Sequence, residues 1–127
     1  MQVQTCPLKI SMTENEITKK QLKIINDALL EKKAENVKII NISTISDVTD
    51  YFVLASGNND SQVDALSDFC LSSMNEAGFK ERSFEGYKSH EWKLIDFGDI
   101  VVHIFNADSR IFYDLDRIWQ DGTVEHL

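Results

Sequence analysis

The fold of this chain is decided by Glu85–Trp119, EGYKSHEWKLIDFGDIVVHIFNADSRIFYDLDRIW. Within it, two strand-like runs, Trp92–Asp96 and Ile100–Phe105, flank the dipeptide Phe97-Gly98. Two short runs of β-branched and aromatic residues on either side of a glycine-containing pair are typical of a tight antiparallel hairpin. We therefore predict two neighbouring antiparallel strands here, joined by a two-residue loop.

The acids of this hairpin point to a role beyond folding. If Phe97-Gly98 is the whole loop, Asp96 lies directly opposite Asp99, and Trp92 lies opposite His103. Like charges directly opposite each other on neighbouring strands destabilise a sheet. A hairpin that keeps such a pair is expected to present its negative charge to a basic partner.

The residues before the hairpin predict helices and strands in turn. Thr13–Glu16 has the pattern of a capping box, which starts a helix. Tyr51–Ser56 is a short apolar run bounded by turn residues, which is typical of a strand covered on both faces. The predicted elements are a helix at about 13–33, strands at 37–42 and 51–56, a helix at about 61–77 and a strand near 79–84.

The residues after the hairpin predict one more helix, at about Ser109–Trp119, and then a mobile tail at Gln120–Leu127. The expected apolar side of that helix consists of Ile111, Phe112, Leu115, Ile118 and Trp119.

The order of the predicted elements indicates an α/β domain with a mixed sheet of about five strands and helices packed on it. The helix at 61–77 is long enough to connect two parallel strands, so we expect one parallel pairing. We predict a flexible N-terminal tail at 1–12, a single domain at 13–119 and the tail at 120–127.

The composition is that of an ordinary globular domain: 127 residues, 43% hydrophobic and 27% charged. The sequence contains no run of 18 apolar residues, so no membrane span is predicted. The N-terminus also has no apolar core typical of a secretion signal. We therefore expect a cytoplasmic location. Cys6 and Cys70 lie in unlike contexts and are predicted to be free thiols.

The net charge of −8 is unevenly distributed, since residues 39–79 contain no Lys or Arg. Binding to nucleic acid needs cations that neutralise phosphates, so little direct nucleic-acid binding is expected. An acidic chain suits a basic protein partner, because complementary charge speeds encounter. The alternative is that the negative charge only keeps the protein in solution.

No pattern of a nucleotide-using enzyme is complete in the sequence. Ser56-Gly57 lies between a predicted strand and a predicted helix, as in a phosphate-binding loop. However, Asn59-Asp60-Ser61 places a carboxylate where the phosphate would lie. Asp114-Leu115-Asp116 lies on a predicted helix, where its two carboxylates point about 200° apart and cannot share an ion.

No metal or cofactor site is predicted either. Asp96, Asp99 and His103 are a set that arises easily by chance, and neither His90 nor His126 completes it by spacing. We interpret His103 as a sheet histidine whose ring is hydrogen-bonded.

A resemblance to a known family comes from an ordered set of short motifs between about Val37 and Trp119. No single motif is diagnostic, but their order and spacing together resemble the ribosomal silencing factor family, also called RsfS or Iojap. The matching pieces are Thr49–Val53, Ala55–Asn58, Glu85-Gly86, Trp92, Asp96–Asp99, Val102–Phe105 and Arg110–Leu115.

The resemblance implies an α/β domain similar in outline to the nucleotidyltransferase fold, without enzymatic activity. It implies docking on the large ribosomal subunit at its fourteenth protein, a basic protein of the intersubunit face. Docking there would sterically prevent the small subunit from joining and so repress translation. A homodimer is also compatible with the family.

The resemblance further implies partner contacts for nine residues. Trp92 would be an aromatic anchor. Glu85, Asp96 and Asp99 would supply negative charge. Tyr87, Lys88 and His90 would form the rim, and two more matching positions are Arg110 and Tyr113.

Structural roles remain open for two of these nine residues. On physical grounds alone, Trp92 either anchors a partner or caps the core. Arg110 either contacts the partner or ties the last helix to the hairpin through Asp96 or Asp99.

Two other functions remain as alternatives. One is a nucleotide-using enzyme with a nucleotidyltransferase-like fold, which a nucleotide with magnesium would stabilise against heat. The other is a ribosome assembly factor, which would bind the large subunit without blocking subunit joining.

Overall fold

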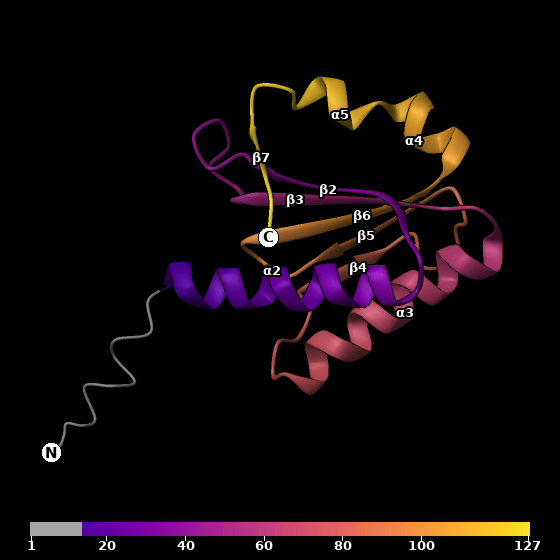
Figure 1. Ribbon diagram of the computed structural model, residues 1–127, viewed down its shortest axis with the longest axis horizontal. Helices are drawn as coiled ribbons and strands as arrows, with labels where there is room; N and C mark the ends of the chain where they lie inside the picture. Colours follow the sequence, from indigo (N-terminus) through magenta and orange to yellow (C-terminus); the bar gives the residue numbers. More distant parts are fainter. Residues whose placement is uncertain (1–13) are drawn as a thin grey trace, which may run out of the picture.

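The computed structural model describes residues 14–127, which form a mixed sheet with helices on both faces (Figure 1). The strands are β2 (Glu35–Asn41), β3 (Tyr51–Gly57), β4 (Ser83–Glu85), β5 (Trp92–Asp96), β6 (Ile100–Asn106) and β7 (Thr123–Glu125). Their order in the sheet is β4-β5-β6-β3-β2-β7, in which β3 and β6 pair in parallel and all other neighbours are antiparallel. The helices are α2 (Glu14–Glu31), α3 (Asp60–Glu76), α4 (Ala107–Tyr113) and α5 (Leu115–Ile118). The predicted α/β class is confirmed, with six strands in place of about five.

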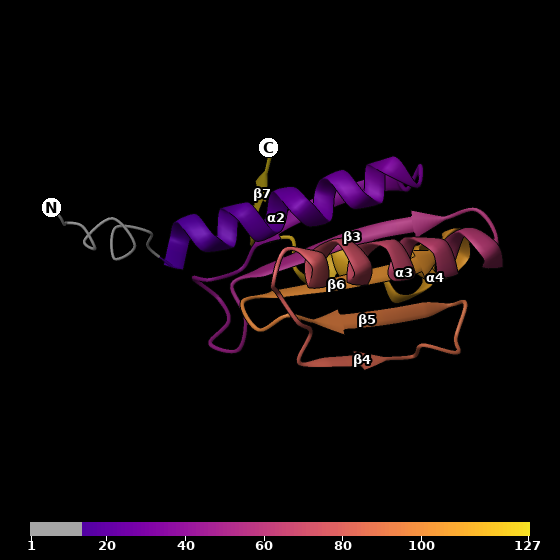
Figure 2. The ribbon, with the colours of Figure 1, turned by 90° about the horizontal axis from the view of Figure 1, so that it is seen from below.

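The two long helices and the two short ones cover opposite faces of the sheet. In Figures 1 and 2, α2 and α3 lie side by side under one face, and α4 and α5 lie over the other. The central strands β3 and β6 are therefore covered on both sides, as predicted for residues 51–56. Because α4 and α5 are short, they leave part of their face uncovered over β5 and β4.

The main core lies between the sheet and the two long helices. Alternate residues of the strands point into it, as the period of two requires. Fully buried members are Leu22, Ile25 and Leu29 of α2, Val63, Leu66, Cys70 and Met74 of α3, and Val53, Ile95, Val102 and Ile104 of the sheet.

The second core, on the other face, is smaller and largely aromatic. Its buried centre is Ile40, Ile42, Leu54 and Phe105, with partly buried Phe52, Trp92, Tyr113, Leu115 and Trp119 packed around it. Phe52 makes edge-to-face contacts with Trp119, at 5.0 Å between ring centroids, and with His103, at 4.7 Å. These contacts fix α5 and the residue after it on the sheet.

The hairpin is confirmed, but its loop lies one residue further along the chain than predicted, so each cross-strand partner is shifted by two residues and Trp92 lies opposite Phe105 instead of His103. The loop is Gly98-Asp99, and Phe97 N–H donates to the carbonyl of Ile100 at 2.9 Å. Asp96 consequently lies opposite Val101, and no carboxylates oppose each other. The shift puts Gly98, with φ +99°, at the first loop position, where a positive φ is needed, and it buries Phe97 in the main core.

The predicted last helix is broken in two by Asp114, whose φ of 52° is left-handed. One left-handed residue redirects the chain, so the helical period does not continue from α4 into α5. Three residues of the predicted apolar side are consequently exposed: Ile111 by 77%, Phe112 by 80% and Ile118 by 58%.

Arg110 has a structural role, but its partners are not the hairpin acids that the sequence suggested. The guanidinium is 9% exposed and binds Asp116 through two hydrogen bonds, of 2.8 Å from Nε and 3.0 Å from Nη2. Its Nη1 donates to Ser56 Oγ at 2.9 Å. Arg110 therefore ties α4, α5 and the end of β3 together.

The C-terminal residues are not a free tail as predicted. Thr123–Glu125 form β7, which pairs antiparallel with β2. The Asn41 amide also donates to the Glu125 carboxylate at 3.4 Å. A strand of three residues has too little period to be found from sequence.

The remaining predictions concern the two cysteines, the N-terminal residues and a membrane span. Cys70 is a free thiol in the main core, and burial raises its pKa to about 12. The capping residue Thr13, Cys6 and the predicted tail at 1–12 lie outside the described residues. Within residues 14–127, no helix is both long enough and apolar enough to cross a membrane.

The ion pair of Asp116 predicts a pH-dependent contribution to stability. Hydrogen bonds from Arg110 lower the pKa of Asp116 despite its burial, and the charge of Lys38 acts in the same direction. A lowered carboxyl pKa stabilises the fold above its unfolded value of about 4, and this contribution is lost as the pH falls through the folded value. We expect Asp116→Asn to lower the free energy of unfolding at pH 7 by about 2 kcal/mol.

Urea unfolding of both proteins at pH 7 and at about pH 3 measures this effect. The difference in the free energy of unfolding between wild type and Asp116→Asn should be smaller at the lower pH. Asp121→Asn, a change of an exposed carboxylate in the same segment, is the control and should have little effect at either pH. A gap that is equal at both pH values would contradict the role assigned to the ionised pair.

Candidate functional site

The structure divides the predicted site residues between the two ends of β5. Glu85, Tyr87, Lys88 and His90 lie at the end where β5 begins with Trp92. Asp96 and Asp99 lie at the hairpin end, about 13 Å further along the strand. Tyr113 of α4 joins the first group, with its ring 4.6 Å from that of Trp92. The sequence therefore predicted one site where the structure has a main group and a distant acidic pair.

Beside this group, on the face that α4 and α5 leave uncovered, lies an open groove of about 340 Å³. Of the predicted site residues, Glu85, Trp92 and Tyr113 line it, and Tyr87, Lys88 and His90 do not. Its floor is apolar and aromatic, and two exposed carboxylates stand at its edge. The lining residues are Glu85, Gly86, Ser89, Glu91, Trp92, Leu94 and Tyr113.

Trp92 forms the floor of the groove and is held from below. Its indole Nε1 donates to His103 Nδ1 at 3.0 Å. Its ring stacks on Phe105 at 5.2 Å between centroids and contacts Tyr113 from the side. The two roles left open for Trp92 are compatible, because the ring packs on the second core and also lines the groove.

His103 is a buried sheet histidine with a hydrogen-bonded ring, as predicted. It is 4% exposed, and burial lowers its pKa to about 4, so it is neutral at pH 7. Since Nδ1 accepts from Trp92, the ring proton belongs on Nε2, which has no partner among the described residues. No group of three His, Cys, Asp or Glu side chains in residues 14–127 could hold a metal ion.

One wall of the groove is the rim loop, which we define as Gly86–Glu91. It folds on itself: Ser89 N–H donates to the Gly86 carbonyl at 2.8 Å. The Ser89 hydroxyl in turn accepts from the amides of Glu91 and Trp92. Tyr87 is 61% exposed on this loop, and the Lys88 ammonium lies 5.8 Å from the centre of its ring.

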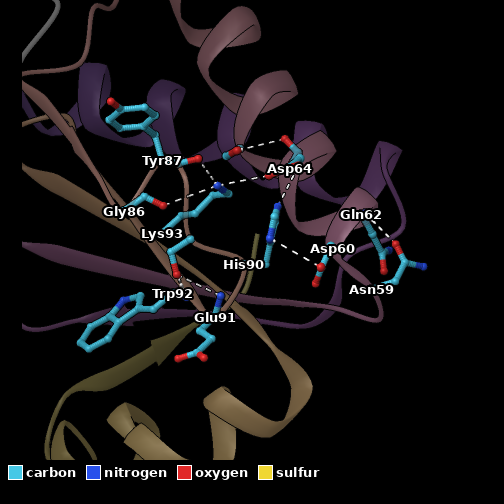
Figure 3. Close-up of polar contacts among 12 residues, drawn as sticks. Asn59, Asp60, Gln62, Asp64, Gly86, Tyr87, His90, Glu91, Trp92 and Lys93 are labelled. Atoms are coloured by element: carbon cyan, nitrogen blue, oxygen red, sulfur yellow. Dashed lines mark hydrogen bonds and ion pairs between the residues drawn. The ribbon is translucent and has the colours of Figure 1, made fainter.

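Lys93 holds the rim loop from the inner side, a role that the sequence analysis missed. Its side chain is 1% exposed, and its ammonium lies 3.2 Å from Asp64 Oδ1 of α3 (Figure 3). It also donates to the backbone carbonyls of Tyr87 and, at 3.5 Å, of Gly86. The signal was present in the sequence, because the alternation of β5 puts Lys93 on the same inward face as Ile95.

His90 makes a second link between the rim loop and α3. Its Nε2 lies 3.1 Å from Asp64 Oδ2, and its Nδ1 lies 3.5 Å from Asp60 Oδ2 (Figure 3). Desolvation alone would raise the pKa of Asp64, but hydrogen bonds from Lys93 and His90 outweigh it and lower that pKa. His90 is therefore turned toward the helix, and 38% of its side chain remains exposed.

The distant acidic pair serves the hairpin turn. Asp96 Oδ1 accepts from Gly98 N–H at 2.7 Å. The backbone carbonyl of Asp99 accepts from the amides of Asp50 and Tyr51, at 3.0 Å each, which joins the turn to the start of β3. The carboxylate of Asp99 is on an exposed residue and remains open to a partner.

The places considered for nucleotide chemistry are filled by the protein's own side chains. The N-terminus of α3 is capped by Asn59, whose side chain accepts from Gln62 N–H at 2.8 Å. Ser56 is bound by Arg110, as is Asp116. An anion at the helix N-terminus would meet Asp60 rather than a lysine.

The surface around the groove is suited to protein recognition. Phe112, 80% exposed, lies 5.1 Å from the Tyr113 ring that lines the groove, and Ile111 beside it is 77% exposed. Exposed apolar side chains next to an aromatic floor and a charged edge are typical of protein interfaces.

Comparisons with known proteins agree on one family. A family profile described as "Ribosomal silencing factor during starvation" matches residues 15–127. The chain is 39% identical to ribosomal silencing factor RsfS of Halalkalibacterium halodurans, over 82% of this chain and 90% of that protein. It is 37% identical to that of Bacillus subtilis, over 84% and 90% of the two chains. A crystal structure from Bacillus halodurans superposes with a TM-score of 0.76 at 35% identity, covering 86% of this chain and 99% of that one.

The start of the rim loop predicts a cost for any side chain at Gly86. Its φ is +70°, and an added Cβ would lie 2.5 Å from the carbonyl oxygen of Trp92. We expect Gly86→Ala to lower the free energy of unfolding by roughly 2–3 kcal/mol. Gly78 is the matched control, because it also has a positive φ but has no atom within 4 Å of an added Cβ.

Urea unfolding should give a loss of only about 1 kcal/mol for Gly78→Ala, from backbone strain alone. Equal losses of unfolding free energy in the two variants would mean that the rim loop shifts enough to accommodate the added methyl group.

Proposed function

This chain belongs to the ribosomal silencing factor family, and we propose that it binds the large ribosomal subunit and thereby prevents the small subunit from joining it. The observation that carries the proposal beyond family membership is the groove: an aromatic floor held rigidly from below, with two exposed carboxylates at its edge. Such a surface suits a basic protein, and the chain as a whole carries a net charge of −8.

The partner we propose is the fourteenth protein of the large subunit, on the intersubunit face, as the sequence resemblance implies. Ribosomal proteins that contact RNA are basic, because they must neutralise phosphates. A lysine or arginine of that partner, lying over Trp92 and Tyr113, would meet the ring faces and the carboxylates of Glu85 and Glu91 together.

The predicted contact residues take different parts in this proposal. Trp92 and Tyr113 form the floor, Glu85 supplies charge, and Tyr87, Lys88 and His90 belong to the rim loop. Glu91 is added to the charged edge, and Arg110 is assigned to the fold alone. Asp96 and Asp99 form a second acidic contact further along β5.

Steric blockade needs no chemistry. A protein that occupies the intersubunit face excludes the small subunit by volume, so binding alone accounts for silencing. We therefore propose that the protein has no enzymatic activity and acts in the cytoplasm, where it meets free large subunits.

Co-sedimentation with separated large and small subunits, followed by a subunit-joining assay, tests the proposal. We expect the protein to sediment with the large subunit only and to reduce the amount of joined ribosomes. Binding without any effect on joining would indicate an assembly role instead. Absence of binding to the large subunit would refute the proposal.

The acidic edge predicts how charge controls the encounter. We expect the double change Glu85→Gln and Glu91→Gln to lower the rate constant of association with the large subunit roughly threefold or more at low salt. The difference should disappear at high salt, because salt screens exposed charges. The dissociation rate should change less.

The control variant is Glu31→Gln with Glu76→Gln, two exposed acids at the C-terminal ends of α2 and α3, away from the groove. It removes the same amount of charge, so an equal drop in association rate would mean that net charge, and not the groove edge, directs binding.

A further inference from the structure

We propose that Lys93 is a positioning residue of this binding surface: its buried ammonium, paired with Asp64, holds the rim loop in the shape that forms the groove wall. The inference rests on the proposed function, because it concerns the surface that would meet the ribosome. Lys93 is 1% exposed and lies on the opposite face of β5 from Trp92, so it cannot touch a partner itself.

The contacts of the ammonium account for all its hydrogen-bonding capacity. A lysine has three N–H donors, and three acceptors surround this one: Asp64 Oδ1 and the carbonyls of Gly86 and Tyr87. Two of these three acceptors belong to the backbone of the rim loop. The buried ammonium therefore keeps all its hydrogen bonds only while the rim loop stays in this position.

Burial makes this tie costly to break. An ammonium withdrawn from water must keep its partners, since an unpaired buried charge is strongly unfavourable. If the rim loop moved away, Lys93 would retain only Asp64. The arrangement in which the rim loop contacts Lys93 is therefore favoured in the free protein, before any partner binds.

His90 strengthens the same arrangement from the other end of the loop. Lys93 holds its beginning, at Gly86 and Tyr87, while His90 reaches Asp64 and Asp60 on the first turns of α3 (Figure 3). The loop is consequently clamped between the sheet edge and α3, with its outer side toward the groove. A surface that is ordered before binding loses less conformational entropy on binding.

The test compares Lys93→Met with wild type in two measurements on the full chain. Methionine keeps much of the apolar volume and removes the ammonium, so we expect the domain to stay folded. Hydrogen exchange of the rim-loop amides, Ser89 above all, should become about tenfold faster, while the amides of β3 and β6 keep their protection. Affinity for the large subunit should fall about tenfold.

Two further variants complete the design. Lys23→Met removes an equal charge from an exposed ion pair on α2 and should change neither measurement. Asp64→Asn removes the negative charge of the half-exposed partner of the buried ammonium without altering the groove lining, and it should reproduce the faster loop exchange. It also serves as the test variant if Lys93→Met fails to fold.

The outcomes separate this inference from the proposed function. Unchanged loop exchange in a folded Lys93→Met protein would overturn the inference, as would faster exchange with undiminished affinity. Faster exchange across the whole sheet would show a general stabilising role instead. If the wild type itself does not bind the large subunit, the proposed function fails, and loop exchange alone decides whether Lys93 holds the loop.

Discussion

The parallel pair of β3 and β6 is the constraint on which the rest of the structure depends. Both strands are apolar on both sides, so both faces of the sheet must be covered. Two long helices cover one face over the central strands (Figure 2). The other face receives only the short α4 and α5, which an ion pair holds over β3, and the aromatic residues next to them are left partly open. The groove is thus the part of a two-sided sheet that its own helices do not reach.

Much of this architecture could be predicted from the sequence, because it depends on period and length. The buried central strand, the long helix before the hairpin and the two hairpin strands follow from local patterns of apolar residues. What escaped prediction depends on single residues. The hairpin register was decided by the burial of Phe97 and the φ of Gly98, and the last helix was broken by one left-handed residue, Asp114.

The candidate site shows the same division between pattern and contact. The sequence identified Trp92 and the residues before it, because an aromatic residue next to a polar loop is a pattern of consecutive residues. It could not separate Arg110, whose partners Ser56 and Asp116 are brought to it only by folding. Lys93 was overlooked although strand alternation points it inward, since a charged residue in a core position makes sense only once its acceptors are known.

The two outermost strands have a consequence for how copies of the protein behave at high concentration. β4 and β7 bound the sheet, and each is only three residues long. A long exposed edge offers a row of free backbone groups on which another chain can extend the sheet, and this is how ordered aggregates begin. Edges this short offer few such groups, and Glu85 and Glu125 add negative charge there. The sheet therefore ends in a way that discourages fibrous self-association.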